Sequence, residues 1–558
     1  MRKNNAFRRA AALMAALSIT VSLAAPAFAE TYYYIDDGDI TITKDENGQT
    51  VKQGNKEAEN IGADEEIIIT THKEATTTLE SDLEGPAAED TGFGPVVEEN
   101  YQPAPPAQPE DAEEPKDADQ PEDDDQKNAE ESENDEAQKD ADQPENTDRQ
   151  ENAGQQPQPQ QAAPADAAPA APAPANGFCK NIITVINNAA TALKLTLKDV
   201  KIDVSDTGKN TGYPWTSDEG KAALSVQGNG NVEIELDGNN ELKSGPHRAG
   251  LEKNTSTSTG TLTLKDDNNE AGSLTATGGD WGAGIGNGGY YGNSDNRSGE
   301  NITITGGTVN ATGGWGGAGI GGGYYGSGKN ITIKGGTVTA TGGEEGAGIG
   351  GGYYYGGGYY GNGYYGNGEN IKITDGTVNA TGGWGGAGIG GGGGGGNGAG
   401  GNGKNITIIG GTVTAGGGYR GAGIGGGISG SGKNITITGG TVNADGGTNA
   451  AGIGGGATGS GSNVTVSGAA QVTAIAGKSN GYYGAGATIG NGGDFTGSEN
   501  VDGKEIQADI SRVTTGYIHH IIYDPALVSE DNPLGIVREW WEPERPQPNP
   551  EDPEDPED

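Results

Sequence analysis

The residues of this chain best suited to chemistry are aromatic side chains that recur beside glycine-rich segments. Trp315 and Trp384 each precede a G-G-A-G-I-G segment, and Trp281 and Tyr419 stand before closely similar segments. Tryptophan and tyrosine rings combine a flat apolar face with a polar edge. Sugar rings present flat C–H faces edged with hydroxyl groups, so this recurring pattern indicates carbohydrate binding.

The glycines of these segments complete the predicted site. If Ala318 and Ile320 point inward on a strand, alternation turns Gly317 and Gly319 outward. One face of the molecule would then carry no side chains and would form a bare floor between aromatic rims. The predicted ligand-binding residues are Trp281, Trp315, Trp384, Tyr419, Tyr324, Tyr325, Gly317, Gly319, Gly386 and Gly388.

The spacing of two tryptophans supports this hypothesis. Trp315 and Trp384 are two repeats apart, which is about 9.6 Å if each repeat adds one strand spacing. That distance is close to the length of a disaccharide unit. The alternative is that glycine permits tight packing between repeats and that the tyrosine-rich loops only cover them.

A catalytic site is not evident from the sequence. Acidic residues in the regular repeats are scattered, and the four histidines form no repeated or paired constellation. The glycine runs lack the G-K-[ST] of a phosphate loop and the Asp of calcium-binding nonapeptides. We expect no enzymatic activity and no cofactor, with Ca²⁺ possible through ligands that are unknown. A polysaccharide lyase stays open as an alternative, and it would need carboxylates brought together across repeats.

These residues are positioned by an internal repeat. The stretch 300–320 recurs downstream with a basic period of 29 residues, and longer steps arise only from insertions after G-A-G-I-G. Each repeat contains three short segments, N-I-T-I, G-T-V-N-A and G-A-G-I-G, and the first two alternate apolar and polar residues. Stacked units of this period form solenoids. We predict an all-β fold, a three-sided, single-stranded, right-handed parallel β-helix of about nine coils over 193–490.

An asparagine stands at one corner of each regular repeat. Asparagine tolerates left-handed backbone and can hydrogen-bond to its equivalent one coil away. We therefore predict a structural ladder, and we expect positive φ in the Gly-Gly corner at 306–307 and its equivalents. The predicted ladder residues are Asn301, Asn330, Asn370, Asn405, Asn434 and Asn463.

The flanking segments differ sharply in composition. Residues 84–176 contain 26 Asp and Glu against 4 Lys and Arg, a net of −22 that is half of the chain's −44. Such a stretch cannot bury enough apolar surface to fold. The first 29 residues show basic residues, an apolar run and an A-x-A site, which is typical of a signal peptide. The predicted domains are a signal peptide (1–29), an N-terminal cap (30–83), a disordered linker (84–176), the β-helix (177–520), and a cap remnant with an acidic Pro-rich tail (521–558).

The repeat N-I-T-I-T-G-G-T-V-N-A-T-G-G-W-G-G-A-G-I-G-G-G resembles a family of secreted bacterial carbohydrate-binding-domain proteins with a pectate-lyase-like β-helix. The opening Y-Y-Y-I-D-D-G-D-I-T-I-T is similar to that family's lead-in. The resemblance implies a secreted or cell-surface, non-catalytic protein that binds polysaccharide or a surface glycan. We expect a monomer, with no nucleic-acid partner and no membrane insertion. A structural or adhesive rod without a small ligand is the alternative.

Overall fold

The computed structural model describes residues 31–62, 65–72, 177–209, 218–253, 258–268, 270–289, 298–356, 366–396, 400–529, 532–533 and 535–543. The chain divides into two units, one of which spans Thr76–Ala171. That unit, which holds most of the predicted linker, lies outside the described residues. So do the predicted signal peptide and the acidic tail after Pro543.

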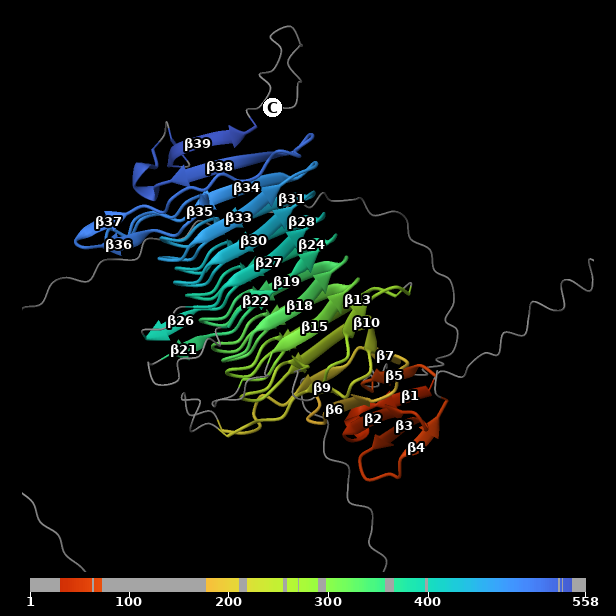
Figure 1. The fold of residues 1–558 in the computed structure, drawn as a ribbon. Coiled ribbons are helices and arrows are strands. Elements are labelled where there is room, and N and C mark those ends of the chain that lie inside the picture. The colour runs from red at the N-terminus through yellow and green to blue at the C-terminus, as the bar shows by residue number, and fades with distance from the viewer. Residues whose placement is uncertain are drawn as a thin grey trace, which may run out of the picture. The chain divides into compact units, whose positions relative to one another are not determined.

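The described part of the chain is a three-sided parallel β-helix (Figure 1). Each regular coil contributes one strand to each of three faces, in the order N-I-T-I, G-T-V-N-A and G-A-G-I-G, which we name the first, second and third face. The first and second faces form one 22-stranded sheet because β10 runs through both, and the third face is a 13-stranded sheet.

The strands of each face, in stacking order, are as follows. The first face contains β1 (Thr31–Tyr34), β5 (Ile67–Thr70), β7 (Leu193–Lys198), the start of β10 (Val232–Lys243), β12 (Leu262–Lys265), β15 (Gly299–Ile304), β18 (Gly328–Ile333), β22 (Gly368–Glu369) with β23 (Lys372–Ile373), β27 (Gly403–Ile408), β30 (Gly432–Ile437) and β33 (Gly461–Val466). The second face contains β8 (Lys201–Asp203), the end of β10, β13 (Gly272–Thr277), β16 (Thr308–Thr312), β19 (Thr337–Thr341), β24 (Thr377–Thr381), β28 (Thr412–Gly416), β31 (Thr441–Asp445), β34 (Gln471–Ala476), β38 (Tyr517–Tyr523) and β39 (Ile536–Glu542). The third face contains β4 (Glu59–Ile61), β3 (Gly48–Gln53), β2 (Ile40–Asp45), β6 (Ile183–Asn187), β9 (Leu224–Gln227), β11 (Leu251–Glu252), β14 (Ile285–Gly286), β17 (Ile320–Gly321), β20 (Ile349–Gly350), β25 (Ile389–Gly390), β29 (Ile424–Gly425), β32 (Ile453–Gly454) and β35 (Ile489–Gly490).

The apolar columns of the repeat form the core. Ile302 pairs with Ile331 on the first face, and Ile349 pairs with Ile389 on the third face although 40 residues separate them. All of these side chains are fully buried. From β7 to β33 the described strands make nine coils on the first face, which confirms the predicted fold class and coil count.

The predicted asparagine ladder is present near the start of the first-face strands, and its third member, Asn370, stands between β22 and β23. Each ladder residue has positive φ, between 53° and 58°. The side-chain amide of Asn301 donates to the Thr259 carbonyl oxygen at 3.2 Å, and that of each later ladder residue donates to the side-chain oxygen of the previous asparagine at 3.0–3.1 Å. The Gly-Gly corner between the first and second faces also behaves as predicted, because Gly307 and Gly336 have φ of 78° and 82°. Side-chain hydrogen bonds thus link successive coils where the backbone turns.

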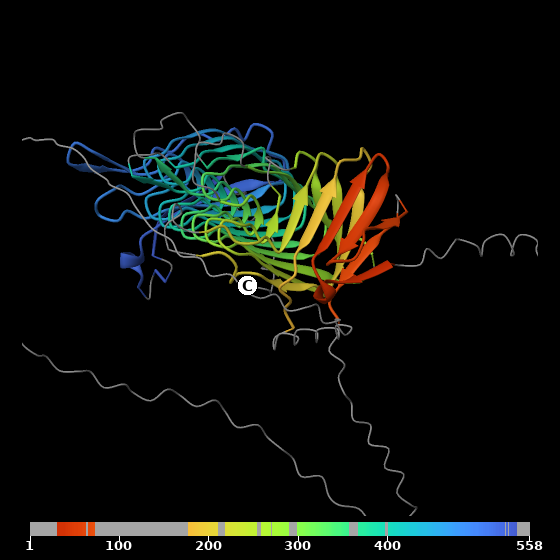
Figure 2. The same ribbon diagram turned by 90° about the horizontal axis from the view of Figure 1, so that it is seen from below.

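Antiparallel hairpins close the solenoid on different faces. At the start, β2 pairs with β3 and β3 with β4, while β2 and β5 pair in parallel with β6 and β7. Figure 2 shows these N-terminal strands, in red and orange, beside the yellow strands of the next coils. At the other end β38, the predicted capping strand, extends β34, and β39 pairs with it in antiparallel fashion. The folded part therefore continues past residue 520 to Glu542, and Trp540 and Trp541 belong to it.

Small elements complete the description. Two short sheets lie on insertions after the third face: β21 (Tyr354–Gly356) pairs with β26 (Gly394–Gly396), and β36 (Asp494–Thr496) with β37 (Glu499–Val501). Both project to the left of the solenoid in Figure 1. Two 3-10 turns, η1 (Ile35–Asp37) and η2 (Pro525–Leu527), lie in the end segments.

Candidate functional site

Four of the predicted aromatic residues lie along the corner between the second and third faces, whereas Tyr324 and Tyr325 follow the third-face strand β17. Trp315, Trp384 and Tyr419 each stand five residues before the buried isoleucine of the third face, whereas Trp281 stands four residues before Ile285. Trp281 therefore occupies a different column, the one held by Gly316 in the next coil. Both residues have φ of 75°. A difference of one residue in spacing thus turns Trp281 away from the direction taken by the other three.

The aromatic residues of the earlier coils pack on one another and form a buried aromatic cluster. Trp281 and Tyr324 are only 3% and 4% exposed, and Tyr353 is also buried. Trp315 and Tyr325 are partly buried against them. The Trp281 ring lies edge to face with the rings of Trp315 and Tyr324, with centroids 4.4 and 4.9 Å apart. These five side chains fill the space between their loops and the corner, and Trp281 and Tyr324 offer no open face to a ligand.

The glycines do not form an open floor, and that expectation was wrong. Gly317 and Gly319 are buried. A Cβ at Gly317 would lie 2.0 Å from the carbonyl oxygen of Gly282, and one at Gly319 would lie 2.7 Å from that of Gly348. Real Cβ atoms do not approach other atoms within 3.0 Å, so glycine is required for neighbouring backbones to come together. The same close approach exists at Gly386 and Gly388.

The later coils present their aromatic residues to solvent. Trp384 is 45% exposed and Tyr419, one coil further on, is 40% exposed. Their rings are stacked with centroids 5.4 Å apart and an angle of 27° between the planes. The guanidinium carbon of Arg420 lies 5.9 Å from the Trp384 ring centre and 5.6 Å from that of Tyr419. This half of the corner is an accessible surface that combines aromatic rings with a cation.

A loop of the last coil extends this surface. The step from Ile453 to Ile489 exceeds the basic period, and the extra residues form the loop 477–485. Tyr482 in this loop is 55% exposed, and Arg420 lies 4.7 Å from the ring centre of Tyr483. We name Trp384, Tyr419, Arg420, Tyr482 and Tyr483 the C-terminal aromatic patch.

Two asparagines hold the loop in place. The side-chain amide of Asn449, which is buried in the preceding coil, donates to the carbonyl oxygens of Tyr483 and Gly484 at 3.0 and 2.8 Å. The Asn480 amide donates to the Tyr419 hydroxyl at 3.3 Å, and its oxygen accepts the backbone N–H groups of Tyr482 and Tyr483 at 3.0 and 2.8 Å. Sequence reasoning missed Arg420 and both loop tyrosines as site residues. The sequence signal was the G-Y-R-G-A-G-I-G segment, in which arginine follows Tyr419 whereas glycine follows Trp315 and Trp384.

A carboxyl group lies in the coil between Trp315 and Trp384. Burial, and secondarily Glu344, raise the pKa of the Glu345 side chain to about 7. Its Oε2 atom is buried without a hydrogen-bond partner. The room for this carboxyl comes from Gly385 and Gly393, because a Cβ at either position would lie within 2.6 Å of that oxygen.

The other titratable side chains are dispersed. No three His, Cys, Asp or Glu residues of the described segments lie close enough together to hold a metal ion. His519 and His520 lie on opposite sides of β38, as adjacent strand residues do. His519 stacks on Trp541 and contacts Glu539, whereas His520 is buried and bonds to Thr488 at 2.6 Å. Burial lowers the pKa of His520 to about 4.

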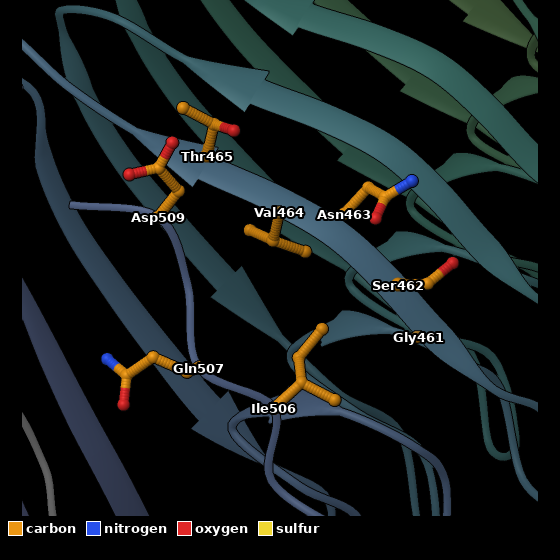
Figure 3. Close-up of a pocket in the computed structure, with 8 residues that line it drawn as sticks. All are labelled: Gly461, Ser462, Asn463, Val464, Thr465, Ile506, Gln507 and Asp509. Carbon is orange, nitrogen blue, oxygen red and sulfur yellow. The ribbon is translucent and has the colours of Figure 1, made fainter. Parts of the chain in front are cut away.

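A shallow hollow lies at the end of the first face, away from the aromatic corner. Figure 3 shows it between the last first-face strand, with Val464 and Thr465, and the returning segment that carries Ile506, Gln507 and Asp509. Asp509, its one acidic group, is engaged by the hydroxyl and backbone N–H of Ser511, which lower its pKa. The other side chains of the hollow are uncharged, and none of them is aromatic.

Comparison with known proteins supports the fold. Four stretches match a family model described as a beta helix repeat: residues 302–324, 331–353, 406–428 and 435–457. No curated protein and no solved structure matched the chain. The repeat and the parallel sheets together define a protein built from β-helix repeats.

Among the described residues, no helix has the length and apolar character needed to cross a membrane.

Proposed function

We propose that this chain is an exported, non-catalytic β-helix protein that binds carbohydrate through the C-terminal aromatic patch. The observation that carries the proposal is the stacked, exposed pair of Trp384 and Tyr419 on successive coils. Large exposed apolar patches on soluble proteins often mark binding sites. Here the rings stand on a rigid stack of strands, which keeps their spacing fixed.

The patch differs from the site predicted by the sequence in where the ligand would lie. Trp281 and Tyr324 contribute to packing, and the glycines hold the coils together. Trp384 and Tyr419 keep the role that the sequence hypothesis gave them, with the loop 477–485 as an added wall. Export is proposed from the basic and apolar pattern of residues 1–29.

A glycan array probed with the full chain tests this function, with and without Ca²⁺. We expect selective binding that weakens at least tenfold when Trp384 and Tyr419 are both replaced by Ala. Ile409→Ala is the matched control, because Ile409 is 42% exposed and follows a first-face strand. Binding that survives the double substitution would show that the patch is not the site.

A structural or adhesive surface rod is the second candidate, and the buried aromatic cluster favours it. Those rings pack on one another instead of facing solvent. This packing is expected if the tyrosine-rich loops only cover the coils and bind no ligand. A blank array with a folded protein would favour this function over carbohydrate binding.

A further inference from the structure

We propose that the acidic, proline-rich segment 544–558 of this chain binds in the hollow of Figure 3, along the free edge of β33, and completes the first face as its last strand. The inference concerns the end of the solenoid and does not depend on the proposed carbohydrate binding. The pairing of β33, the place where the chain leaves the solenoid, and the prolines and charges of the segment support it.

The outer edge of β33 is mostly unpaired. Among the described residues, β33 pairs with β30 on one side, and on the other side only Asp509 pairs with it, in a single bridge to Thr465. The Asp509 N–H donates to the Val464 carbonyl oxygen at 2.9 Å, and the Val466 N–H donates to the Asp509 carbonyl oxygen at 3.0 Å. The first face therefore ends in an edge that a further strand can extend.

The strand β33 has none of the features that protect an edge. Exposed edges are templates for pairing with another chain, and proteins protect them with charged side chains, proline or a covering segment. The last strand of the second face, β39, has three charged side chains and is followed by Pro543. In contrast β33, with the sequence G-S-N-V-T-V, has no charge and no proline. A covering segment is therefore expected at β33.

The chain leaves the described end of the solenoid beside this hollow. The side-chain amide of Gln507, which lines the hollow, donates to the carboxylate of Glu542 at 3.1 Å. Pro543 follows and is the last described residue. The segment 544–558 spans about 50 Å when extended, whereas the strand β33 spans about 20 Å. The segment is therefore long enough to reach β33 and to run along it.

The prolines of the segment favour a terminal strand. Proline occupies every second position of P-Q-P-N-P, residues 546–550. Neighbouring residues of an extended strand direct their backbone N–H groups to opposite edges, and proline has no N–H group. The remaining N–H groups, those of Gln547, Asn549 and Glu551, would therefore lie on one edge. Such a strand can donate to one neighbour only, as the last strand of a sheet does.

The charges of the segment and of the hollow's surroundings are complementary. Six of the last eight residues of the segment are Asp or Glu. Lys504 and Arg512 precede and follow the returning segment 506–509 in the chain. Lys433 is the register partner of Ser462 in β33. These three cations are exposed, and none of them forms an ion pair with a described residue. An acidic strand along β33 would supply their missing partners.

Hydrogen exchange of the full chain, resolved to the amides of Gln547, Asn549 and Glu551, tests the proposal. A synthetic peptide of residues 544–558 is the unbound reference. We expect these amides to exchange at least tenfold more slowly in the full chain than in the peptide, at every protein concentration. Gln547→Pro with Asn549→Pro removes two of the three donors and should abolish the protection of Glu551. Gln547→Ala with Asn549→Ala is the matched control, because it keeps the N–H groups and should preserve most of the protection.

A second pair of variants tests the charges. Lys504→Gln with Arg512→Gln should reduce the protection of the segment at least threefold. Lys334→Gln with Lys372→Gln is the control, because it removes the same charge from exposed positions in the middle of the first face and should leave the protection unchanged.

Exchange in the full chain at the rate of the free peptide would overturn the proposal. Protection of Glu551 that persists in the double proline variant would overturn it too, because pairing through alternate N–H groups would then be absent. Protection that disappears on dilution would assign the edge of β33 to a second copy of the chain instead. An unchanged circular dichroism spectrum would show that the double proline variant is folded, so that its loss of protection reports release of the segment.

Discussion

Replacement of Gly386 by Ala should destabilise the solenoid severely. The new Cβ would lie 2.1 Å from the carbonyl oxygen of Gly346, against a lower limit of 3.0 Å, so the two coils must separate locally by about 0.9 Å. Two inter-coil hydrogen bonds cross this region, from Gly383 to Gly346 at 2.8 Å and from Gly348 to Ala387 at 3.0 Å. Lengthened by that amount, neither remains a hydrogen bond.

The magnitude follows from these two effects. Overpacking in a close-packed interior costs about 1–3 kcal/mol, and two backbone hydrogen bonds contribute about 1–3 kcal/mol together. We therefore expect the free energy of unfolding to fall by roughly 2–6 kcal/mol. Gly416→Ala is the matched control. No atom lies within 4 Å of the Cβ position at Gly416, and its φ is not positive, so that substitution should be neutral or slightly stabilising.

Urea unfolding followed by circular dichroism measures the global effect, and hydrogen exchange over residues 380–392 measures the local one. Exchange is needed because long repeat arrays can unfold in parts. A Gly386→Ala protein as stable as wild type would refute the conclusion that backbone contact requires this glycine. Loss of glycan binding without loss of stability would instead support the hypothesis, made from the sequence, that the glycines form an exposed binding floor.

Three further predictions concern the corners and the aromatic residues. Asn370→Ala removes both of its ladder hydrogen bonds and strains a backbone at φ 56°, so we expect a loss of about 1–3 kcal/mol in urea unfolding, and a smaller loss for Asn370→Gly. Because the pKa of Glu345 is raised to about 7, its coil should be most stable below pH 4.5, where the carboxyl is protonated in both states, and should lose about 1–2 kcal/mol as the pH rises through 7. Glu345→Gln should remove that pH dependence of local hydrogen exchange; an unchanged profile would contradict the assignment. Trp281→Ala should cost about 3–5 kcal/mol of stability because it empties a buried site, whereas Trp384→Ala should change thermal unfolding by less than about 0.5 kcal/mol.

Much of the fold could be predicted because the repeat is evident from the sequence. A period of 29 residues with apolar columns at fixed offsets fixes the number of coils and the inward residues, such as Ile302 and Val309. The asparagine ladder was predictable for the same reason, since one residue type recurring at one corner must meet its equivalents across a strand spacing. These features depend only on local pattern and on the spacing of stacked strands.

The direction of the glycines could not be predicted in the same way. The alternation rule applies to extended strands, but the third-face strand β17 has two residues, and Gly321 has a φ of 131°. Beyond such a short strand the backbone turns, and the side that alternation assigns to solvent is covered by the backbones of adjacent coils, such as Gly348 against Gly319. Close contact between the backbones of adjacent coils arises only when the coils stack. The length of the repeat therefore does not reveal it.

The sequence by itself determined the repeat, the stacking and the supply of aromatic residues along one corner. Only the tertiary structure decided which of those residues are available. Trp281 is buried because it stands one residue nearer its third-face strand, and Trp384 is exposed because its coil lacks the tyrosines that cover the earlier ones. The tertiary structure also brought Tyr483 to Arg420 across 63 positions of the chain, through a loop that Asn449 and Asn480 dock by hydrogen bonds. A local pattern specifies each coil, but contacts between coils and insertions arise only after the whole array has stacked.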